Sequence, residues 1–232
     1  MSPRVVSLVP SVTETLVAWG LPPVACTRFC EQPEIEAVGG TKRPRLDRIT
    51  ELAPDLVVMN DEENRREDFD ALEAAGLRVH VAGARTVADV PPMLAALAEA
   101  VGAPTPEPWE PPTPPAVPHG TAFVPVWARP WMTLNRDTYG ASMLAAAGWA
   151  GAWDDDDVRY PEVTVAEVVA RGPDAVLAPT EPWTFSEDDL GELADTFGAP
   201  AVLIDGQDLF WWGARTPAAV ERLRIALAVG VA

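Results

Sequence analysis

The chain has 232 residues, of which 48% are hydrophobic, and its 17 basic and 35 acidic residues give a formal net charge of −18. This length and apolar content suit one large or two small domains with a substantial core. The acidic balance argues against nonspecific nucleic-acid binding, which needs a basic face to neutralise phosphates, and against docking on anionic lipid.

No segment reaches the roughly 18 uninterrupted apolar residues that a membrane span requires. The N-terminus also shows no charged segment followed by a long apolar stretch and a cleavage site. We therefore expect a cytoplasmic protein as the sequence stands, or a periplasmic or extracytoplasmic one if a leader has been removed.

The first hundred residues alternate between short apolar runs and amphipathic segments that end at glycine or proline. This alternation predicts a mostly parallel sheet covered by helices. Ser11 is a candidate helix N-cap, because Glu14 three residues later completes a capping-box pattern. The expected strands are Val5–Val9, Val24–Thr27, Leu56–Met59 and Val79–Ala82, and the expected helices are Val12–Trp19, Leu46–Leu52, Asn64–Ala75 and Val87–Val101.

A proline-rich segment divides the chain. Eight of the sixteen residues from Ala103 to Pro118 are proline. Proline lacks a backbone N–H and disfavours helix at the preceding residue, so this segment is predicted to be neither helix nor central strand. We expect a semi-rigid, extended connector.

Beyond this connector the alternation of strand and helix resumes. Thr164 lies where a helix N-cap is expected, with Glu167 three residues later as in a capping box. The expected strands are Thr121–Val126, Ala175–Ala178 and Ala201–Ile204, and the expected helices are Thr138–Ala147, Thr164–Ala170, Glu187–Thr196 and Pro217–Val229.

The two halves contain similar segments. Leu46–Val58 and Val163–Leu177 each read as a short helix, a Pro-Asp turn and a buried strand. The sequence therefore predicts two Rossmann-like α/β lobes that form a clamshell. We expect an N-terminal lobe over residues 1–102, a connector over 103–120 and a C-terminal lobe over 121–232. A cleft between lobes is a favoured site for a small molecule.

The cysteines and histidines do not indicate a metal site. Cys26 and Cys30 have a C-x₃-C spacing that is not the usual zinc pairing, and His80 and His119 lie in unrelated contexts. Buried free thiols are favoured over a disulfide. The acidic run Asp154–Asp157 lacks the alternating spacing of a calcium loop, so a solvated loop is the favoured interpretation.

Candidate ligand-binding residues follow the predicted strands, because ligands of open α/β sheets bind outside the carboxyl ends of the strands. In the N-terminal lobe these residues offer a helix N-terminus, a basic and aromatic pair, a glycine loop and a polar rim. They are Pro10, Ser11, Arg28, Phe29, Gly40, Thr41, Asn60 and Asp61.

The C-terminal lobe supplies mainly aromatic candidates. Large aromatic side chains on loops after strands are typical of ligand sites, although one tryptophan of an adjacent pair packing into the core is an alternative. The adjacent pair is Trp211 and Trp212, in a predicted strand-to-helix loop. The candidates are Trp127, Arg129, Trp131, Glu181, Trp183, Phe185, Trp211 and Trp212.

Six segments outside Ala103–Pro118 carry a resemblance to known proteins, and together they extend over nearly the whole remaining chain. They are Arg4–Glu14, Thr27–Pro33, Val38–Lys42, Ile49–Val57, Trp127–Met132 and Asp208–Gly213. These segments resemble the class III, helical-backbone periplasmic substrate-binding proteins, and those of the C-terminal half resemble the cobalamin-binding branch.

The resemblance implies a two-lobed fold that holds cobalamin, haem or an iron–siderophore for an ABC importer, without chemistry on that ligand. It implies no catalytic cofactor. Because no histidine lies in the expected cleft loops, we also expect no side chain of the protein to ligate the metal of the ligand. A corrin or porphyrin is a broad apolar disc with polar edges, which suits aromatic faces and Arg or Asn donors. Glu62, Glu63 and Glu67 are compared with the importer-docking glutamates of the family, although a solvated helix face is the simpler interpretation.

The chain departs from the family pattern in two respects. The family joins its lobes by one long helix, where this chain has the proline-rich segment, and no leader is present. Three functions therefore stay open: a corrinoid or metal-chelate binder, a cleft hydrolase that uses Asp61 and Glu181, and an interaction module whose prolines bind SH3-like domains. No nucleophile elbow, Walker A loop or H-E-x-x-H motif is present, and the first function is the prediction.

Overall fold

The computed structural model describes residues 3–230, which form two compact units. Unit 1 contains the described residues up to Ala84 together with Asp89–Trp109 and Trp212–Ala214. Unit 2 contains Arg85–Ala88, Glu110–Trp211 and the described residues from Arg215 onward. One of the crossings from unit 1 into unit 2, from Trp109 to Glu110, lies inside the proline-rich segment.

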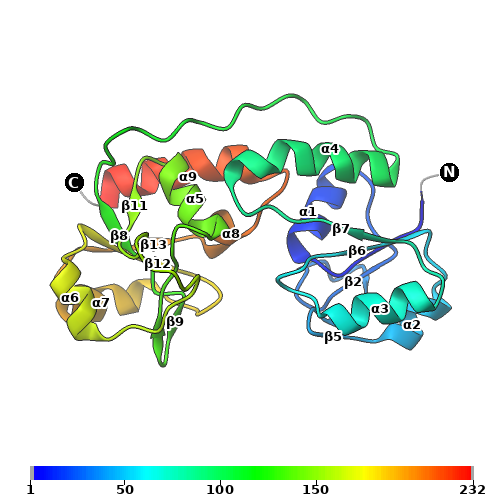
Figure 1. Cartoon of the computed structure of the whole chain (residues 1–232), viewed down its shortest axis with the longest axis horizontal. Helices are drawn as coiled ribbons and strands as arrows, with labels where there is room; N and C mark the ends of the chain where they lie inside the picture. The colour runs from blue at the N-terminus through cyan, green and yellow to red at the C-terminus, as the bar shows by residue number, and fades with distance from the viewer. Residues whose placement is uncertain (1–2, 231–232) are drawn as a thin grey trace. The chain divides into compact units, whose positions relative to one another are not determined.

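Unit 1 is built on a five-stranded sheet whose strands all run parallel, in the order β3-β2-β1-β6-β7 (Figure 1). Most of the residues in β1 and β6 are apolar, because the strands of a parallel sheet are covered on both faces. The strands are β1 Val5–Ser7, β2 Ala25–Cys26, β3 Glu36–Ala37, β6 Leu56–Met59 and β7 Val79–Val81.

Helices cover both faces of this sheet. Alternate strand residues such as Val6 and Val57 pack with Ile49 and Leu72, on the face that carries α2 and α3, while α1 and α4 lie on the other face (Figure 1). The helices are α1 Pro10–Ala18, α2 Leu46–Glu51, α3 Arg66–Ala74 and α4 Val90–Val101, which follows the 3₁₀ turn η1 Val87–Asp89.

The predicted capping role of Ser11 is wrong. The helix α1 begins at Pro10, its N-cap is Val9, and no side chain caps it. Proline suits the first helical position because its fixed φ matches the helix and it has no N–H to leave unsatisfied. Pro10 therefore starts the helix early and places Ser11 inside its first turn.

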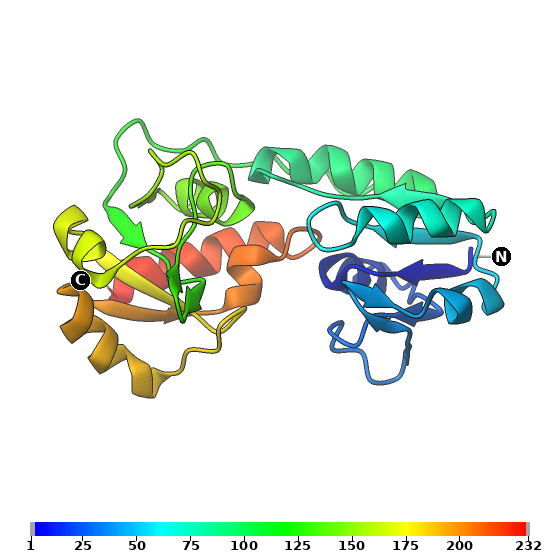
Figure 2. The ribbon, with the colours of Figure 1, turned by 60° about the horizontal axis from the view of Figure 1, so that its bottom comes forward.

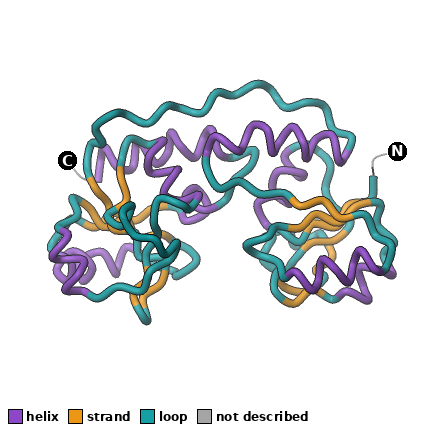
Figure 3. Tube along the Cα trace, in the orientation of Figure 1, coloured by secondary structure: helices purple, strands orange, loops and turns teal. Residues whose placement is uncertain are grey.

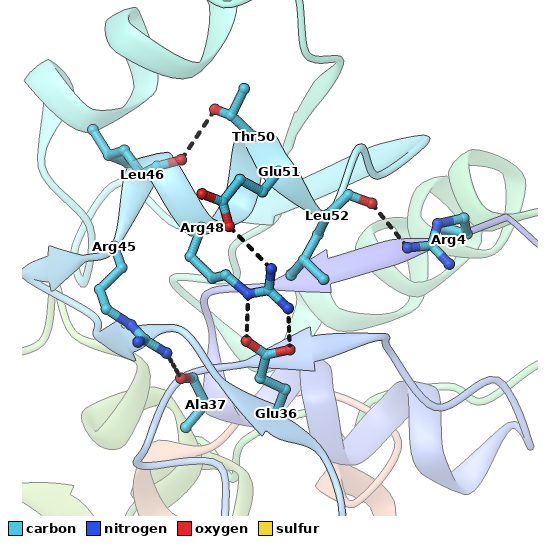
Figure 4. A network of polar contacts seen from close by, with 9 residues as sticks. All are labelled: Arg4, Glu36, Ala37, Arg45, Leu46, Arg48, Thr50, Glu51 and Leu52. Atoms are coloured by element: carbon cyan, nitrogen blue, oxygen red, sulfur yellow. Dashed lines mark hydrogen bonds and ion pairs between the residues drawn. The ribbon is translucent and has the colours of Figure 1, made fainter.

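A polar network ties α2 to the edge of the unit 1 sheet (Figure 4). Arg48 donates to both carboxylate oxygens of Glu36 at 2.7 and 3.0 Å and to Glu51 at 3.0 Å. The Glu36 carboxylate raises the pKa of Arg48, and the Arg48 guanidinium lowers the pKa of Glu36. The hairpin of β4 Gly39–Gly40 and β5 Arg43–Pro44 lies beside this network.

Unit 2 is built on a four-stranded parallel sheet in the order β11-β8-β12-β13. A separate antiparallel hairpin follows β8 in the chain and consists of β9 and β10. The strands are β8 Thr121–Phe123, β9 Trp127–Ala128, β10 Trp131–Met132, β11 Ala150–Gly151, β12 Ala175–Pro179 and β13 Ala201–Ile204.

The helices of unit 2 also form two layers (Figures 1 and 2). Val176 and Ala178 of the sheet pack with Val168 and Phe197 on the side of α6 and α7, while α5 and α9 lie on the opposite side. The capping box that Thr164 and Glu167 were expected to form is confirmed. The helices are α5 Tyr139–Ala146, α6 Val165–Arg171, α7 Leu190–Phe197, α8 Gly206–Phe210 and α9 Thr216–Gly230, with a 3₁₀ turn η2 Glu187–Asp189 before α7.

The similarity predicted between the two halves is confirmed as a shared structural unit. In unit 1, Asp55 between α2 and β6 accepts from the backbone N–H of Arg4 at 2.7 Å and donates its own N–H to the Arg4 carbonyl at 2.8 Å. In unit 2, Asp174 between α6 and β12 makes the same two bonds with Thr121, also at 2.7 and 2.8 Å. Each aspartate thus fixes the start of the neighbouring strand.

The proline-rich segment from Ala103 to Gly120 forms neither helix nor strand (Figure 3). The preceding helix α4 ends at Gly102, which has the left-handed conformation that commonly terminates helices. Across residues 3–230, no helix combines the length and the apolar character needed to cross a lipid bilayer.

Candidate functional site

Each sheet has one point where the strand order reverses, and several candidate residues follow the two strands that meet there. In unit 1 the chain leaves β1 toward β2 on one side and later returns to β6 on the other. The carboxyl ends of β1 and β6 therefore lie side by side, which is the preferred ligand position of such sheets. Pro10 and Ser11 follow β1, and Asn60 and Asp61 follow β6.

Asn60 has a structural role in unit 1. Its side-chain amide donates to the Ala82 carbonyl at 2.9 Å, and its side-chain oxygen accepts from the N–H groups of Glu62 and Glu63 at 2.8 and 3.1 Å. The side chain is buried, so it orders the loop rather than presenting a free amide at the rim. Asp61 is exposed beside it.

Arg28 and Phe29 form a small exposed platform after β2. The Arg28 guanidinium carbon lies 4.8 Å from the centroid of the Phe29 ring, and the ring is 49% exposed. A methyl group on Gly40 would lie 3.2 Å from this ring and 3.6 Å from the guanidinium carbon. Gly40 therefore lets the platform pack onto the β4–β5 hairpin, and Thr41 is half-buried beside it.

The aromatic candidates of unit 2 meet at its own reversal point, between β8 and β12. The Trp127 and Trp183 rings lie edge to face with centroids 5.0 Å apart. Trp131 is parallel to Phe185 at 6.4 Å and contacts Phe197 edge to face at 5.1 Å. We call Trp127, Trp131, Trp183 and Phe185 the aromatic cluster.

The aromatic cluster is anchored at one side and exposed at the other. Phe185 is buried in the unit 2 core, and Trp131 and Trp183 are partly buried against it. Trp127 is 41% exposed. An indole held in place by a neighbouring ring presents a rigid apolar surface at little conformational cost. Arg129, in the turn between β9 and β10, is exposed as well.

Glu181 and Trp211 are joined in unit 2. The Trp211 indole N–H donates to Glu181 Oε1 at 2.6 Å, and the Arg215 guanidinium lies 5.5 Å from the Trp211 ring. Arg215 lies 3.5 Å from buried Asp208, which also accepts two bonds from Arg222 at 2.5 and 2.6 Å. Arg215 therefore links the Trp211 ring to this ion-pair network.

Trp212 is separated from Trp211. Its side chain is only 6% exposed, and it belongs to unit 1 whereas Trp211 belongs to unit 2. The expected strand-to-helix loop also contains a short helix, α8, which ends just before the pair. The adjacent tryptophans therefore do not form one continuous surface, in line with the alternative that one of them packs into the core.

Sequence reasoning missed two features that support the site. Ala214 donates its N–H to Thr15 Oγ1 of α1 at 3.1 Å, which anchors residues 212–214 in unit 1. Asp208 is a buried anion that forms ion pairs with Arg215 and Arg222. In the sequence, the two arginines downstream of Asp208 are the only indication of these ion pairs. The contact with Thr15 joins residues 199 positions apart, and no local pattern announces it.

Three aspartates of the acidic run Asp154–Asp157 make contacts with nearby groups of the same unit. Burial raises the pKa of Asp154, which accepts from the Gly151 N–H at 3.0 Å, and the Arg171 guanidinium lowers the pKa of Asp155 by a 2.6 Å bond. Asp156 accepts from a backbone N–H two residues on. Within the described part of the chain, no group of three or more His, Cys, Asp or Glu side chains is arranged to hold a metal ion.

The chain is similar in sequence to vitamin B12-binding proteins. No protein-family model matches the chain. The vitamin B12-binding protein of Salmonella typhimurium is 26% identical over 193 residues, which cover 76% of this chain and 72% of the relative. The protein of the same name from Salmonella choleraesuis is 25% identical with the same coverage.

Solved structures share the fold across nearly the whole chain. The periplasmic vitamin B12-binding protein BtuF of Vibrio cholerae has a TM-score of 0.78 at 18% identity, over 99% of this chain and 98% of its own. The heme-binding protein RhuT from Roseiflexus has a TM-score of 0.79 at 21% identity, covering both chains completely. BhuT, solved with two hemes, reaches 0.80 at 20% identity and covers 99% of each chain. The chain therefore has the fold of the class III periplasmic binding proteins.

Proposed function

We propose that the protein is a non-catalytic receptor for cobalamin or a related corrinoid, and that the aromatic cluster contacts the ligand. The observation that carries the proposal is the exposed, ring-supported indole of Trp127 at the strand-order reversal of unit 2. The ring supplies a flat apolar face suited to the face of a corrin. The names of the sequence relatives in Salmonella support the same ligand class.

In this proposal the polar candidates recognise the edges of the ligand. Arg28 and Arg129 are exposed and carry several N–H donors in a fixed geometry. The corrin periphery carries amide groups that accept such bonds, and haem carries two carboxylates. Ser11, in the first turn of α1, is buried, and its hydroxyl oxygen has no hydrogen-bond partner among the described residues, so we expect less from it than from these exposed arginines.

Cobalamin is favoured over haem by the candidate residues themselves. Proteins hold haem iron through a His, Cys, Met or Tyr side chain. None of the sixteen candidate residues is of these types. Cobalamin carries its own axial base, so a receptor needs only to enclose it. Haem binding is the second candidate function, because several structures of the same fold are heme-binding proteins.

The proposal extends to transport. As in the importer systems to which the family belongs, the receptor would deliver its ligand to an ABC permease from an extracytoplasmic location. Exposed carboxylates such as Glu62 and Glu67 are candidates for contacts with arginines of a permease, and Glu67 forms an ion pair with Arg65 at 3.1 Å. Such exposed pairs are weak and are easily exchanged for a partner's charges.

A titration with cyanocobalamin and with haem, followed by tryptophan fluorescence and calorimetry, tests the proposal. We expect saturable one-to-one binding of cyanocobalamin. In Trp127→Ala the dissociation constant should rise by about tenfold, because a stacked ring is lost. Trp109→Ala, in the proline-rich segment, is the matched control and should bind normally. If neither cyanocobalamin nor haem shows saturable binding, the proposal is contradicted. If haem alone binds, the second candidate function is selected.

Catalysis is tested in the same samples. The proposed receptor should return its ligand chemically unchanged after prolonged incubation, as judged by mass spectrometry of the released ligand. Glu181→Gln, which keeps an acceptor for the Trp211 indole, should not change this result. Conversion of the ligand by the natural chain that is lost in Glu181→Gln would instead support the hydrolase alternative.

A further inference from the structure

The two cysteines of the chain lie together in unit 1, although they are not part of the aromatic or polar candidate set. Cys26 is the last residue of β2, and Cys30 follows after the turn Thr27–Cys30. This turn is closed by a bond from the Cys30 N–H to the Thr27 carbonyl at 3.2 Å. Both residues are free thiols and are 1% and 2% exposed.

The sulfur of Cys30 is surrounded by hydrogen-bond donors. Thr13 Oγ1 of α1 lies 3.2 Å from it and shares its one hydrogen between this sulfur and the Val9 carbonyl at 3.1 Å. Thr27 Oγ1 lies 3.1 Å from the sulfur, where either atom can be the donor, and it also accepts from the Phe29 N–H at 3.3 Å. The Cys26 thiol also lowers the pKa of Cys30. Such donors stabilise a thiolate.

The two thiols are therefore chemically different. The hydrogen bond from Cys26 is the largest influence that lowers the pKa of Cys30, and Thr13 and Thr27 add to it against the opposing effect of burial. The same contact and burial raise the pKa of Cys26, which stays protonated. A thiolate beside a protonated thiol is the arrangement of an attacking and a resolving cysteine.

We propose that Cys26 and Cys30 form an oxidisable dithiol, in which Cys30 reacts with a hydroperoxide and Cys26 then closes a reversible disulfide. The Cys30 thiolate attacks the terminal oxygen of the peroxide, the O–O bond breaks, and hydroxide or alkoxide leaves and takes up a proton. The Cys26 sulfur then displaces the hydroxyl of the Cys30 sulfenic acid and releases water. In total two thiols lose two electrons and two protons to one peroxide.

The burial of the pair selects the oxidant. A sulfur that is 2% exposed is reached by a small peroxide more readily than by a bulky disulfide. Oxidation would also affect the residues between the two cysteines, because the disulfide would close a short ring that contains Arg28 and Phe29. These two side chains form the exposed platform after β2, so oxidation would fix or shift that platform.

The first test uses the natural chain and no variant. The protein is treated with hydrogen peroxide in native buffer, denatured without reductant, blocked with an alkylating agent and digested with trypsin. Trypsin cleaves after Arg28, so Cys26 and Cys30 fall in separate peptides, Val5–Arg28 and Phe29–Lys42. We expect these peptides to be joined, with a loss of two hydrogen atoms in the intact mass, and to separate after reduction. Unlinked, fully alkylated peptides after peroxide treatment overturn the proposal.

Variants assign the two roles. In Cys26→Ser the sulfenic acid cannot be resolved, so dimedone should label Cys30. In Cys30→Ser, Cys26 should stay unlabelled under the same conditions. Equal labelling in both variants, or labelling of Cys26 alone, contradicts the assignment. Circular dichroism of each variant before treatment identifies the samples that are folded, and the peptide map of the natural chain decides the proposal if either variant does not fold.

A further variant tests the hydrogen-bond environment. Thr13→Val removes one donor to the Cys30 sulfur while keeping a similar shape, and should slow disulfide formation by about tenfold. Thr50→Val is the matched control, because Thr50 is an exposed helical threonine that bonds only its own helix at 3.0 Å. Equal rates in the two variants would show that the hydroxyl does not activate Cys30. None of these readouts depends on which ligand the receptor binds.

Discussion

At the scale of one residue, Gly213 shows how residues 212–214 are held in unit 1, although they are far in sequence from the rest of that unit. Its φ of +138° is a conformation that side chains other than glycine rarely adopt. A methyl group there would also overlap Thr15 Oγ1 and lie 3.4 Å from the Ser11 carbonyl. Backbone conformation and steric space therefore both require glycine.

Gly213→Ala should destabilise the protein by about 3 kcal/mol, since it adds backbone strain to an overpacked contact. The measurement is urea denaturation of the natural and variant chains. Adding Thr15→Ala to the variant removes the overlapping hydroxyl but also the acceptor of the Ala214 N–H, so it should recover only the steric part of the loss. A Gly213→Ala chain as stable as the natural one would show that residues 212–214 are not anchored on α1.

At the scale of elements, the Pro-Asp junctions of the two units are equivalent. Asp55 and Asp174 are exposed aspartates that each bond the N–H of a residue at the start of a parallel strand. Asp174 also accepts from the Thr121 hydroxyl at 3.1 Å. In both units the preceding proline is buried and the following strand is buried, so the same local design recurs.

Asp55→Ala and Asp174→Ala should each lower the free energy of unfolding by about 1 to 2 kcal/mol, because a strand N–H loses its acceptor. Asp174→Ala should cost at least as much as Asp55→Ala because of the additional hydroxyl bond. Asp157→Ala is the matched control, an exposed aspartate in the acidic run. Thermal unfolding followed by circular dichroism measures all three, and a control that costs as much as the junction variants would refute the argument.

The longer elements were predictable from sequence because their signals are local. Apolar runs gave β6 Leu56–Met59 and β13 Ala201–Ile204 with the observed bounds, and the Thr164–Glu167 spacing gave a capping box that forms. The two-residue strands of the β4–β5 and β9–β10 hairpins were not predicted, because two residues carry no periodicity. Ser11 was misplaced because the preference of proline for the first helical turn prevails over a capping pattern.

Part of the candidate site was also predictable from position along the strands. The expectation that loops after neighbouring strands meet placed Trp127 and Trp183 near each other, and the structure has their rings in contact. It did not anticipate that Asn60 would bond its own loop or that Trp212 would be buried. Such outcomes depend on packing between distant segments, which a pattern of residue types does not encode.

At the scale of the whole molecule, the negative net charge of the protein affects how an anionic ligand and a neutral ligand approach it. Many arginines are paired with carboxylates, as Arg48 is with Glu36 and Arg222 with Asp208, so the net charge of −18 is set by the remaining acidic groups. A charge of this size repels an anion beyond contact range, and the repulsion weakens once the Debye length falls to about 10 Å near 0.1 M salt.

The two candidate ligands should therefore respond differently to salt. Haem approaches as an anion, because its two propionates are ionised, so its association rate constant should increase several-fold between low and physiological ionic strength. Cyanocobalamin has no net charge, and its association rate constant should stay nearly constant over the same range. Stopped-flow quenching of tryptophan fluorescence measures both rates on one protein sample. A haem rate that falls with salt would mean that a local basic surface, with exposed Arg28 and Arg129 as its candidates, outweighs the net charge and guides an anionic ligand to the site.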